Sequence, residues 1–214
     1  MIPPILINNE FVTNFTDKAN FFNEFFSNQC TPLENGSSLP TTQNYLTTKT
    51  FDNIDFTDHD ILDIIRSLDA NKAHSHDDIS VRMIKLSDYS IVKPLSIIFR
   101  NSLDSCVFPK EWKKANIVPI HKKNSKQMLG NYKPVSLLPV CGKIFEKIIF
   151  NKLYQYIDGE NLLNINQSGF RPSDSCTNQL LGIVHMILES FDGNPSLEVR
   201  GVFLDLSKAF DSVA

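Results

Sequence analysis

Paired cysteines, long apolar runs and a secretory leader are all missing from this sequence. Its four cysteines are spread over 214 residues without a CxxC pair, which favours reduced thiols inside a cell over a disulfide or zinc framework. No apolar run approaches the roughly 20 residues that a membrane span needs, and the first residues lack the basic and apolar regions of a signal peptide. We therefore expect an intracellular protein that does not associate with membranes.

Acidic side chains are scarce in one segment. Residues 110–152 hold ten lysines against Glu111 and Glu146 alone, a net of +8, although the chain as a whole is at −3. Residues 1–109 carry 8 basic and 14 acidic side chains, and residues 110–214 carry 13 and 10. A basic segment inside an acidic chain predicts an anion-binding surface, for which nucleic acid or nucleotide phosphate is the usual partner. A solvated lysine-rich face is the simpler interpretation.

Apolar spacing predicts a mixed α+β fold. Helical periodicity is expected at 16–29, within 57–73, at 80–87, at 91–107 with a start near Pro94, at 140–157 and at 178–191, the last of these largely buried. Thr16 or Asp17 is expected to cap the first helix, and Thr57 or Asp58 the second. Two short β-branched runs, 115–120 and 133–138, surround a lysine-bearing polar tract and predict a hairpin with a long loop.

A third extended segment, 198–207, predicts an apolar strand that carries Asp205 at its carboxyl end, with Ser207 placed to cap a following helix. An ionised group at the end of a buried strand is costly unless it is paired or metal-bound. Hard carboxylate oxygens suit Mg²⁺, so Asp205 is a candidate metal ligand. A solvated strand end or a helix cap is the alternative, and the segment alone does not decide between them.

Five blocks of sequence point to one family. FLDLSKAFD (203–211) stands after four others in order, which are NKAHSHDDIS (71–80), FPKEWKKANIVPIHKK (108–123), NYKPVSLLPVCGKIFEKII (131–149) and NQSGFRPSDSCTNQL (166–180). Together they resemble the reverse transcriptase of non-LTR, LINE or jockey-type retrotransposons. The resemblance covers residues 50–214, and FLDLSKAFD is similar to the first catalytic motif of the palm.

The resemblance implies a partial right-hand polymerase behind a helical N-terminal or linker region, residues 1–50. Residues 51–214 would form part of the reverse transcriptase domain, with the fingers at about 51–197 and the first strand and helix of the palm at about 198–214. The longer parent would be an RNA-directed DNA polymerase of the cytoplasm and nucleus. Its partners would be an RNA template, a DNA primer and dNTPs, and its cofactor Mg²⁺, with Mn²⁺ as a possible substitute.

The resemblance also implies roles for individual residues. Asp205 and the backbone carbonyl of Leu206 would hold metal ions in a two-metal displacement at phosphorus, and Phe210 would exclude a 2′-hydroxyl. The incoming triphosphate would meet side chains of the fingers hairpin and backbone amides at a helix start, namely Lys122, Lys123, Lys133, Lys208 and Ala209. The template-side wall would include Gln167, Gly169, Phe170 and Arg171.

Three departures from the family pattern qualify this expectation. Lys133 stands where arginine is usual, which keeps the charge but loses the bidentate fork. Ser75 stands where glycine is usual, and a serine would be strained there if the backbone needed a positive φ. The (F/Y)xDD motif does not occur in these 214 residues. Because one aspartate cannot hold two divalent ions, we expect this chain to be inactive in isolation.

Other interpretations remain open at this stage. The alternatives to a polymerase segment are a non-catalytic remnant that binds nucleic acid weakly at most, and an unrelated α/β interaction module in which Asp205 is only a cap. The HxHxD pattern at 74–78 resembles a set of zinc ligands, but a polar turn is the favoured interpretation. Cys141 and Cys176 are expected to be buried packing groups, and Trp112 is expected to pack against the fingers more than to stack on a base.

Overall fold

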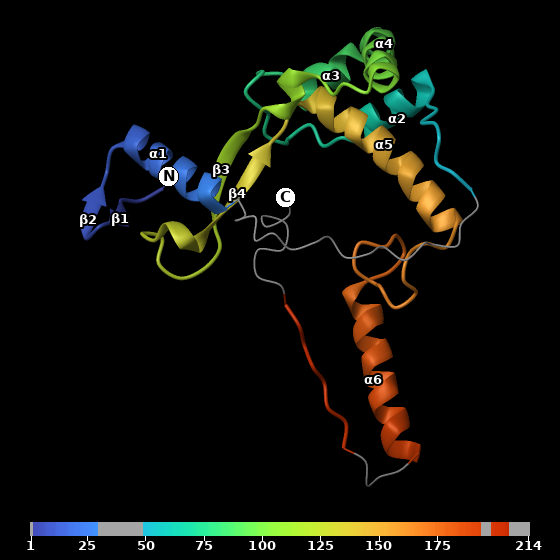
Figure 1. Cartoon of the computed structure of the whole chain (residues 1–214). Helices are drawn as coiled ribbons and strands as arrows, with labels where there is room; N and C mark the ends of the chain where they lie inside the picture. Colours follow the sequence, from blue (N-terminus) through green and yellow to red (C-terminus); the bar gives the residue numbers. More distant parts are fainter. Residues whose placement is uncertain (1, 30–48, 194–197, 206–214) are drawn as a thin grey trace, which may run out of the picture. The chain divides into compact units, whose positions relative to one another are not determined.

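The computed structural model describes residues 2–29, 49–193 and 198–205, and these fall into two units. The first unit runs to Leu153, and the second begins at Tyr154. Figure 1 shows the elements in chain order. The mixture of helices with two small antiparallel sheets confirms the α+β class. None of the helices among the described residues is long and apolar enough to cross a membrane.

Four helices form the main core of the first unit. They are α2 (Asp58–Ser67), α3 (Val81–Ser87), α4 (Tyr89–Ser105) and α5 (Val140–Gly159). Phe99 of α4 and Phe145 of α5 stack with ring centroids 4.8 Å apart, and both are almost fully buried. Trp112, in a short 3-10 helix (Lys110–Lys113), meets both rings edge-on. The expectation that Trp112 packs rather than stacks on a base fits this contact.

Local chemistry explains where these helices begin. The Thr57 side chain accepts a hydrogen bond from the Asp60 backbone N–H, and the Asp60 carboxylate accepts one from the Thr57 backbone N–H, which completes a capping box. The predicted cap at Thr57 is therefore confirmed. The start predicted near Pro94 is wrong: α4 begins at Tyr89 and contains Pro94, which cannot donate the helical hydrogen bond to the carbonyl of Ser90.

The predicted hairpin is confirmed. Strands β3 (Asn116–His121) and β4 (Tyr132–Leu137) pair antiparallel, with Ile120 opposite Lys133 and His121 opposite Tyr132. A short 3-10 helix (Leu129–Asn131) closes the loop between them.

An N-terminal hairpin was not predicted. Strands β1 (Ile5–Ile7) and β2 (Glu10–Val12) pair around Asn8 and Asn9, whose φ angles of 48° and 67° are both left-handed. Two such residues are the signature of a tight hairpin turn of the I′ kind, and asparagine favours it. Each strand has only three residues, which is too short for alternation to be visible in the sequence.

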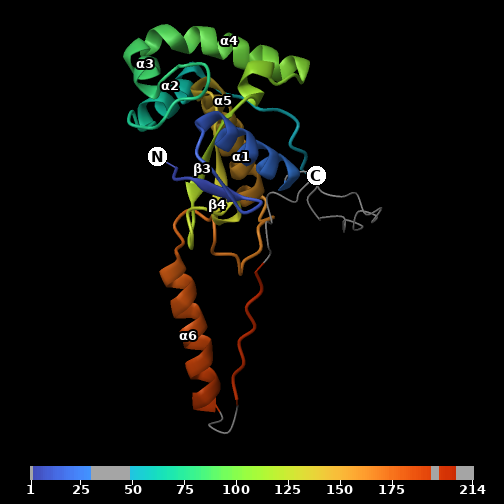
Figure 2. The ribbon, with the colours of Figure 1, turned by 90° about the vertical axis from the view of Figure 1, so that its left-hand side faces the viewer.

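Helix α1 (Phe15–Gln29) follows this hairpin and lies beside β3, as both views show (Figures 1 and 2). Phe22 and Phe26 are buried with Ile5 and Tyr132 in a second apolar cluster. The predicted caps Thr16 and Asp17 are wrong, because the Asn14 side chain accepts from the backbone N–H groups of both residues. The connector expected at 31–50 lies almost wholly outside the described residues.

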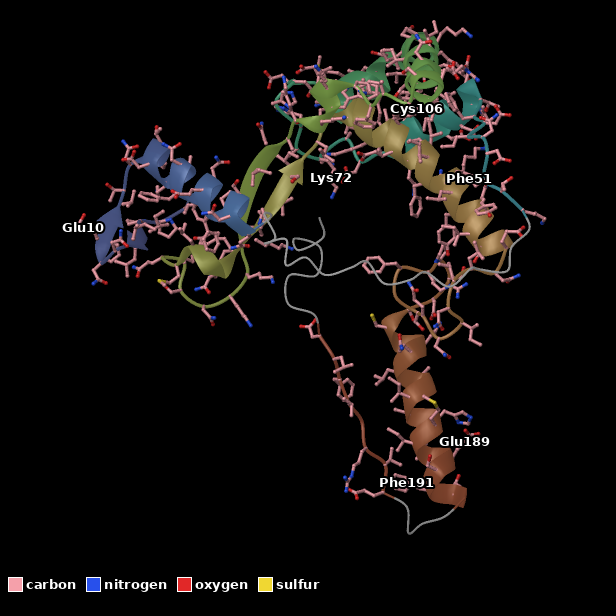
Figure 3. All side chains as sticks on the ribbon, viewed as in Figure 1. Glu10, Phe51, Lys72, Cys106, Glu189 and Phe191 are labelled. Atoms are coloured by element: carbon pink, nitrogen blue, oxygen red, sulfur yellow. The ribbon has the colours of Figure 1, made fainter. Side chains whose placement is uncertain are left out.

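The second unit has no buried side chain among its described residues. Helix α6 (Cys176–Gly193) confirms the predicted helix, but the expected burial is wrong, and Cys176 is exposed whereas Cys141 is buried. Figure 3 shows the α6 side chains, with Glu189 and Phe191 labelled. The strand expected over 198–207 is absent from residues 198–205, whose apolar side chains Val202, Phe203 and Leu204 are exposed. A strand needs a neighbour to supply hydrogen bonds, and this segment has none among the described residues.

Candidate nucleotide and nucleic-acid interface

The two faces of the β3–β4 hairpin have different neighbours. Residues opposite each other share a face, and faces alternate along each strand. Tyr132 and His121 therefore share one face, and their rings meet edge-on with centroids 5.3 Å apart. Tyr132 also meets Phe22 of α1 at 5.0 Å, so this face packs against α1. Burial there raises the pKa of the Tyr132 hydroxyl, which stays neutral.

The opposite face presents lysines. Lys133 shares it with its partner Ile120, which is 42% exposed. The backbone N–H of Lys122 donates to the Asn131 carbonyl (2.8 Å) and so extends the ladder by one pair. Lys122 thus lies two residues beyond Ile120 on the same face as Lys133. The structure brings these two predicted residues together, while Lys123 lies on the loop that follows.

Hydrogen bonds hold the loop from Lys122 to Asn131 in place. The Tyr132 hydroxyl donates to the Lys126 carbonyl (2.7 Å), and the Asn131 side chain donates to the Ser125 carbonyl (2.8 Å). From the N-terminal hairpin, the Leu6 backbone N–H donates to the Gln127 carbonyl (2.8 Å). The loop is therefore positioned from both sides, which lowers the entropy lost when an anion binds its lysines.

The lysines of this hairpin carry uncompensated charge. Within the described ranges, no carboxylate forms an ion pair with the side chains of Lys122, Lys123, Lys126 or Lys133, all of which are exposed. By contrast, Lys114 pairs with Glu111 at 2.8 Å, and Lys152 lies 3.8 Å from Asp60. We name the exposed set Lys122, Lys123, Lys126 and Lys133 the lysine hairpin. Four unpaired ammonium groups on one hairpin form a local positive field that attracts phosphate.

Ser75 links the hairpin to the helical core. Its hydroxyl donates to the Leu137 carbonyl at the end of β4 (2.5 Å), and the residue is 1% exposed. The Ser75 backbone is not among the positive-φ positions. The conditional expectation of strain at this position is therefore not met, and the serine contributes a buried hydrogen bond that a glycine would lack.

In the second unit, Gln167, Gly169, Phe170 and Arg171 lie on one loop between α5 and α6. The Arg171 guanidinium donates to the Asp158 carboxylate and to the Asn164 carbonyl, both at 3.3 Å. The Gln167 side chain donates to the Gly169 carbonyl (3.1 Å). Phe170 is 94% exposed at a φ of 63°, an unusual conformation for a bulky residue. Arg171 thus braces the loop, and Phe170 is the side chain that the loop presents to solvent.

Asp205 is an exposed carboxylate in the same unit. No three His, Cys, Asp or Glu side chains gather into a metal-binding group anywhere in the described part of the chain. The described residues around Asp205 therefore do not make a two-ion site. Leu206, Lys208, Ala209 and Phe210 lie outside the described residues.

The family of this chain follows from comparison with known proteins. Residues 120–214, which include β4 and Asp205, match the family model described as Reverse transcriptase (RNA-dependent DNA polymerase). Over 155 residues, or 72% of its length, the chain is 36% identical to RNA-directed DNA polymerase from mobile element jockey of Drosophila melanogaster. Residues 120–214 of this chain belong to the reverse transcriptase family.

Other relatives agree. The chain is 31% identical over 155 residues to Probable RNA-directed DNA polymerase from transposon BS of Drosophila melanogaster. It is 30% identical over 156 residues to the jockey polymerase of Drosophila funebris. These matches confirm the resemblance to jockey-type retrotransposon reverse transcriptases. The chain spans only 17% of the length of each of these curated relatives, and so corresponds to a segment of such a reverse transcriptase.

Two residues of the lysine hairpin region were not singled out from the sequence. Lys126 belongs to the basic segment, but its place on the loop depends on the bond between its carbonyl and Tyr132. Tyr132 lies inside the reverse transcriptase block 131–149. Neighbouring residues of a strand point to opposite faces, so an exposed Lys133 would have predicted a buried Tyr132.

The histidines of the HxHxD pattern lie near carboxylates, with His74 3.6 Å from Asp78 and His76 3.9 Å from Glu111.

Proposed function

We propose that this chain supplies the phosphate-binding side of the fingers, and the first catalytic aspartate, of a retrotransposon RNA-directed DNA polymerase. The observation that carries the proposal is the lysine hairpin, where Lys122 and Lys133 share one exposed face. A dNTP presents a triphosphate that needs cations arranged on a firm support. The bonds from Tyr132 and Leu6 supply that support to the loop.

The finer assignments belong to the same proposal. Residues 1–50 would precede the polymerase domain, the fingers would span about 51–197, and the palm of a right-hand fold would begin at about 198. Gln167, Gly169, Phe170 and Arg171 would border the template, with Lys208, Ala209 and Phe210 beside the incoming nucleotide. An RNA template, a DNA primer and dNTPs would be partners of the longer protein.

The proposed cofactor is Mg²⁺, with Mn²⁺ as a substitute, and Asp205 and the Leu206 carbonyl are its proposed ligands in this chain. Two ions need several carboxylate oxygens, and Asp205 belongs to no group of three or more His, Cys, Asp or Glu side chains among the described residues. Further acidic groups would have to join Asp205 before nucleotide transfer.

A nucleotide-binding experiment tests the lysine hairpin. A fluorescent dATP analogue is titrated with Mg²⁺ into residues 1–214 carrying a primed RNA template. Replacing both Lys122 and Lys133 with glutamine should raise the Kd about tenfold, because charge-assisted bonds to phosphate are lost. Lys133→Arg should retain binding, since arginine adds a bidentate fork.

The matched control removes two exposed lysines outside the hairpin. Lys110 and Lys113 lie on the 3-10 helix beside Trp112 and form no ion pair within the described residues. Their joint replacement with glutamine changes the net charge equally and should alter the Kd less than twofold. Equal losses in both double variants would refute a specific role for the hairpin and favour a diffuse basic surface.

A primer-extension assay tests the role of Asp205. Residues 1–214 alone should extend no primer with Mg²⁺ or Mn²⁺, because a single carboxylate does not hold two ions. Addition of a separately expressed segment that carries the (F/Y)xDD motif should be required for extension, and Asp205→Asn should abolish that extension. Extension by residues 1–214 alone would overturn the expectation that the remaining carboxylates come from elsewhere.

A further inference from the structure

A cavity of about 610 Å³ lies between α1, Ile2 near the N-terminus and β3. Its size falls within the range of small-molecule sites. Rings of Phe15, Phe22 and Phe26 line it from α1, and Ile117 and Pro119 line it from β3. All of these residues belong to the first unit. Ile117 and Pro119 lie on the face of the β3–β4 hairpin opposite the one that carries Lys133. The cavity is therefore separate from the proposed nucleotide-binding surface.

A buried cation also lines this cavity. Lys18 is 6% exposed, an unusual burial for a lysine. Its ammonium donates to the Ile2 carbonyl (2.9 Å) and lies 4.6 Å from the centre of the Phe15 ring. An ammonium has three N–H donors, so the Ile2 bond leaves two. No ion pair joins Lys18 to a carboxylate within the described residues, and Asp17 beside it is exposed.

The helix adds to this positive charge. Lys18 lies in the first turn of α1, at the positive end of the helix dipole, where a cation is unfavourable. A buried charge without an opposite charge is costly. An anion in the cavity would offset both effects. Asn23 of α1 also lines the cavity, and its side chain carries a neutral amide donor.

We propose that this cavity binds a small aromatic carboxylate. The carboxylate would accept hydrogen bonds from the Lys18 ammonium, and the ring would pack against Phe22, Phe26 and Ile117. Aromatic rings in the wall favour edge-on or offset contacts with a planar ligand. The site requires a negative charge and an apolar body in one molecule, so a neutral molecule of the same shape should bind more weakly.

The test compares 2-naphthoate with its neutral counterpart 2-naphthamide, by calorimetry on residues 1–214. The ¹³C-methyl signal of Ile117 should shift on binding, while that of the core residue Ile148 should not. Lys18→Met keeps the apolar stem and removes the charge. It should raise the Kd for naphthoate about tenfold to a hundredfold and leave naphthamide unchanged.

Lys85→Met is the matched control, because the Lys85 ammonium also donates to a backbone carbonyl, that of Arg66 at 2.8 Å, but on an exposed surface. This variant should bind naphthoate like the unaltered protein. Equal binding of acid and amide, no binding of either, or unchanged naphthoate binding in Lys18→Met would each overturn the proposal.

A second variant keeps the test decisive if Lys18→Met fails to fold. Ala19 lines the cavity from an exposed position on α1, and Ala19→Leu adds volume there without burying a polar group. It should abolish the Ile117 shift with naphthoate. If Ala19→Leu leaves the naphthoate Kd unchanged, the ligand binds elsewhere and the proposal fails.

Discussion

Helices α5 and α6 have similar lengths and similar apolar content but opposite surroundings. In α5, Ile144, Phe145 and Ile148 are almost fully buried against α2 and α4. In α6, Leu180, Leu188 and Phe191 are 60%, 55% and 43% exposed. Both segments show helical spacing in the sequence. Helix formation and helix burial are therefore separate outcomes, and burial depends on which other elements are present to cover the apolar face.

The difference predicts where the stability of the described chain resides. Burial of apolar side chains dominates folding free energy, so the first unit should unfold as a cooperative body. The second unit should contribute little to that transition. Trp112 is the only tryptophan and packs on Phe99 and Phe145, so its fluorescence reports the first unit alone.

The largest contrast is expected from phenylalanine truncation in the two helices. Phe145→Ala removes a ring stacked between neighbours and should lower the free energy of unfolding by about 3–5 kcal/mol. Phe191→Ala removes a partly exposed ring and should change it by less than about 0.5 kcal/mol. Urea titrations followed by Trp112 fluorescence measure both. A loss in Phe191→Ala comparable to that in Phe145→Ala would show that α6 is part of the same cooperative core.

Replacing the N-terminal caps of α2 and α6 should give a smaller difference in stability between the two units. Thr57 caps α2, and the Ser175 hydroxyl accepts from the Asn178 backbone N–H (3.2 Å) at the start of α6. Thr57→Ala should cost about 1 kcal/mol in the Trp112 transition, because α2 contributes Ile61 and Leu62 to the core. Ser175→Ala should leave that transition unchanged and speed amide exchange only near the start of α6. Equal shifts in the Trp112 transition would contradict the independence of α6.

Short-range signals were sufficient to predict much of the first unit. The Thr57 cap with Asp60 three residues later, the lysine-bearing hairpin and the helix from Val140 were all expected, because each is encoded by one continuous stretch of the sequence. The Asn14 cap was missed by two residues, since several polar residues near the start of α1 offered the same chemistry. Asn8 and Asn9 were the only signal for the N-terminal hairpin.

Long-range features were harder to predict. The apolar run that ends at Asp205 has the composition of a strand, but only pairing with another segment would make it one. Placing Lys122 and Lys133 on the same face required the strand register, which the sequence of the loop does not define. The role of Arg171 required knowledge that Asp158 and Asn164 lie beside it. The sequence therefore predicted which residue types form the candidate site, whereas the residues that contact them could be identified only in the folded structure.

The smallest contrast is expected in how acid pH changes the stability of the first unit when Asp60 or Asp174 is replaced. The backbone N–H of Thr57 is the main cause that lowers the pKa of Asp60. The Ser168 side chain is the main cause that lowers the pKa of Asp174. A lowered pKa in the folded state stabilises that state at neutral pH, and the contribution is lost as the pH falls below about 4, through the lowered folded pKa.

Asp60→Asn should therefore unfold at lower urea than the unaltered protein at pH 7, and the gap should narrow as the pH falls from about 4 to 3. Asp174→Asn should match the unaltered protein in the Trp112 transition at both pH values, because its hydrogen bonds lie within the second unit. A gap that stays constant with pH in Asp60→Asn would mean that the capping hydrogen bond does not depend on the carboxylate charge. A lower urea midpoint in Asp174→Asn than in the unaltered protein would show that the second unit is energetically coupled to the core of the first.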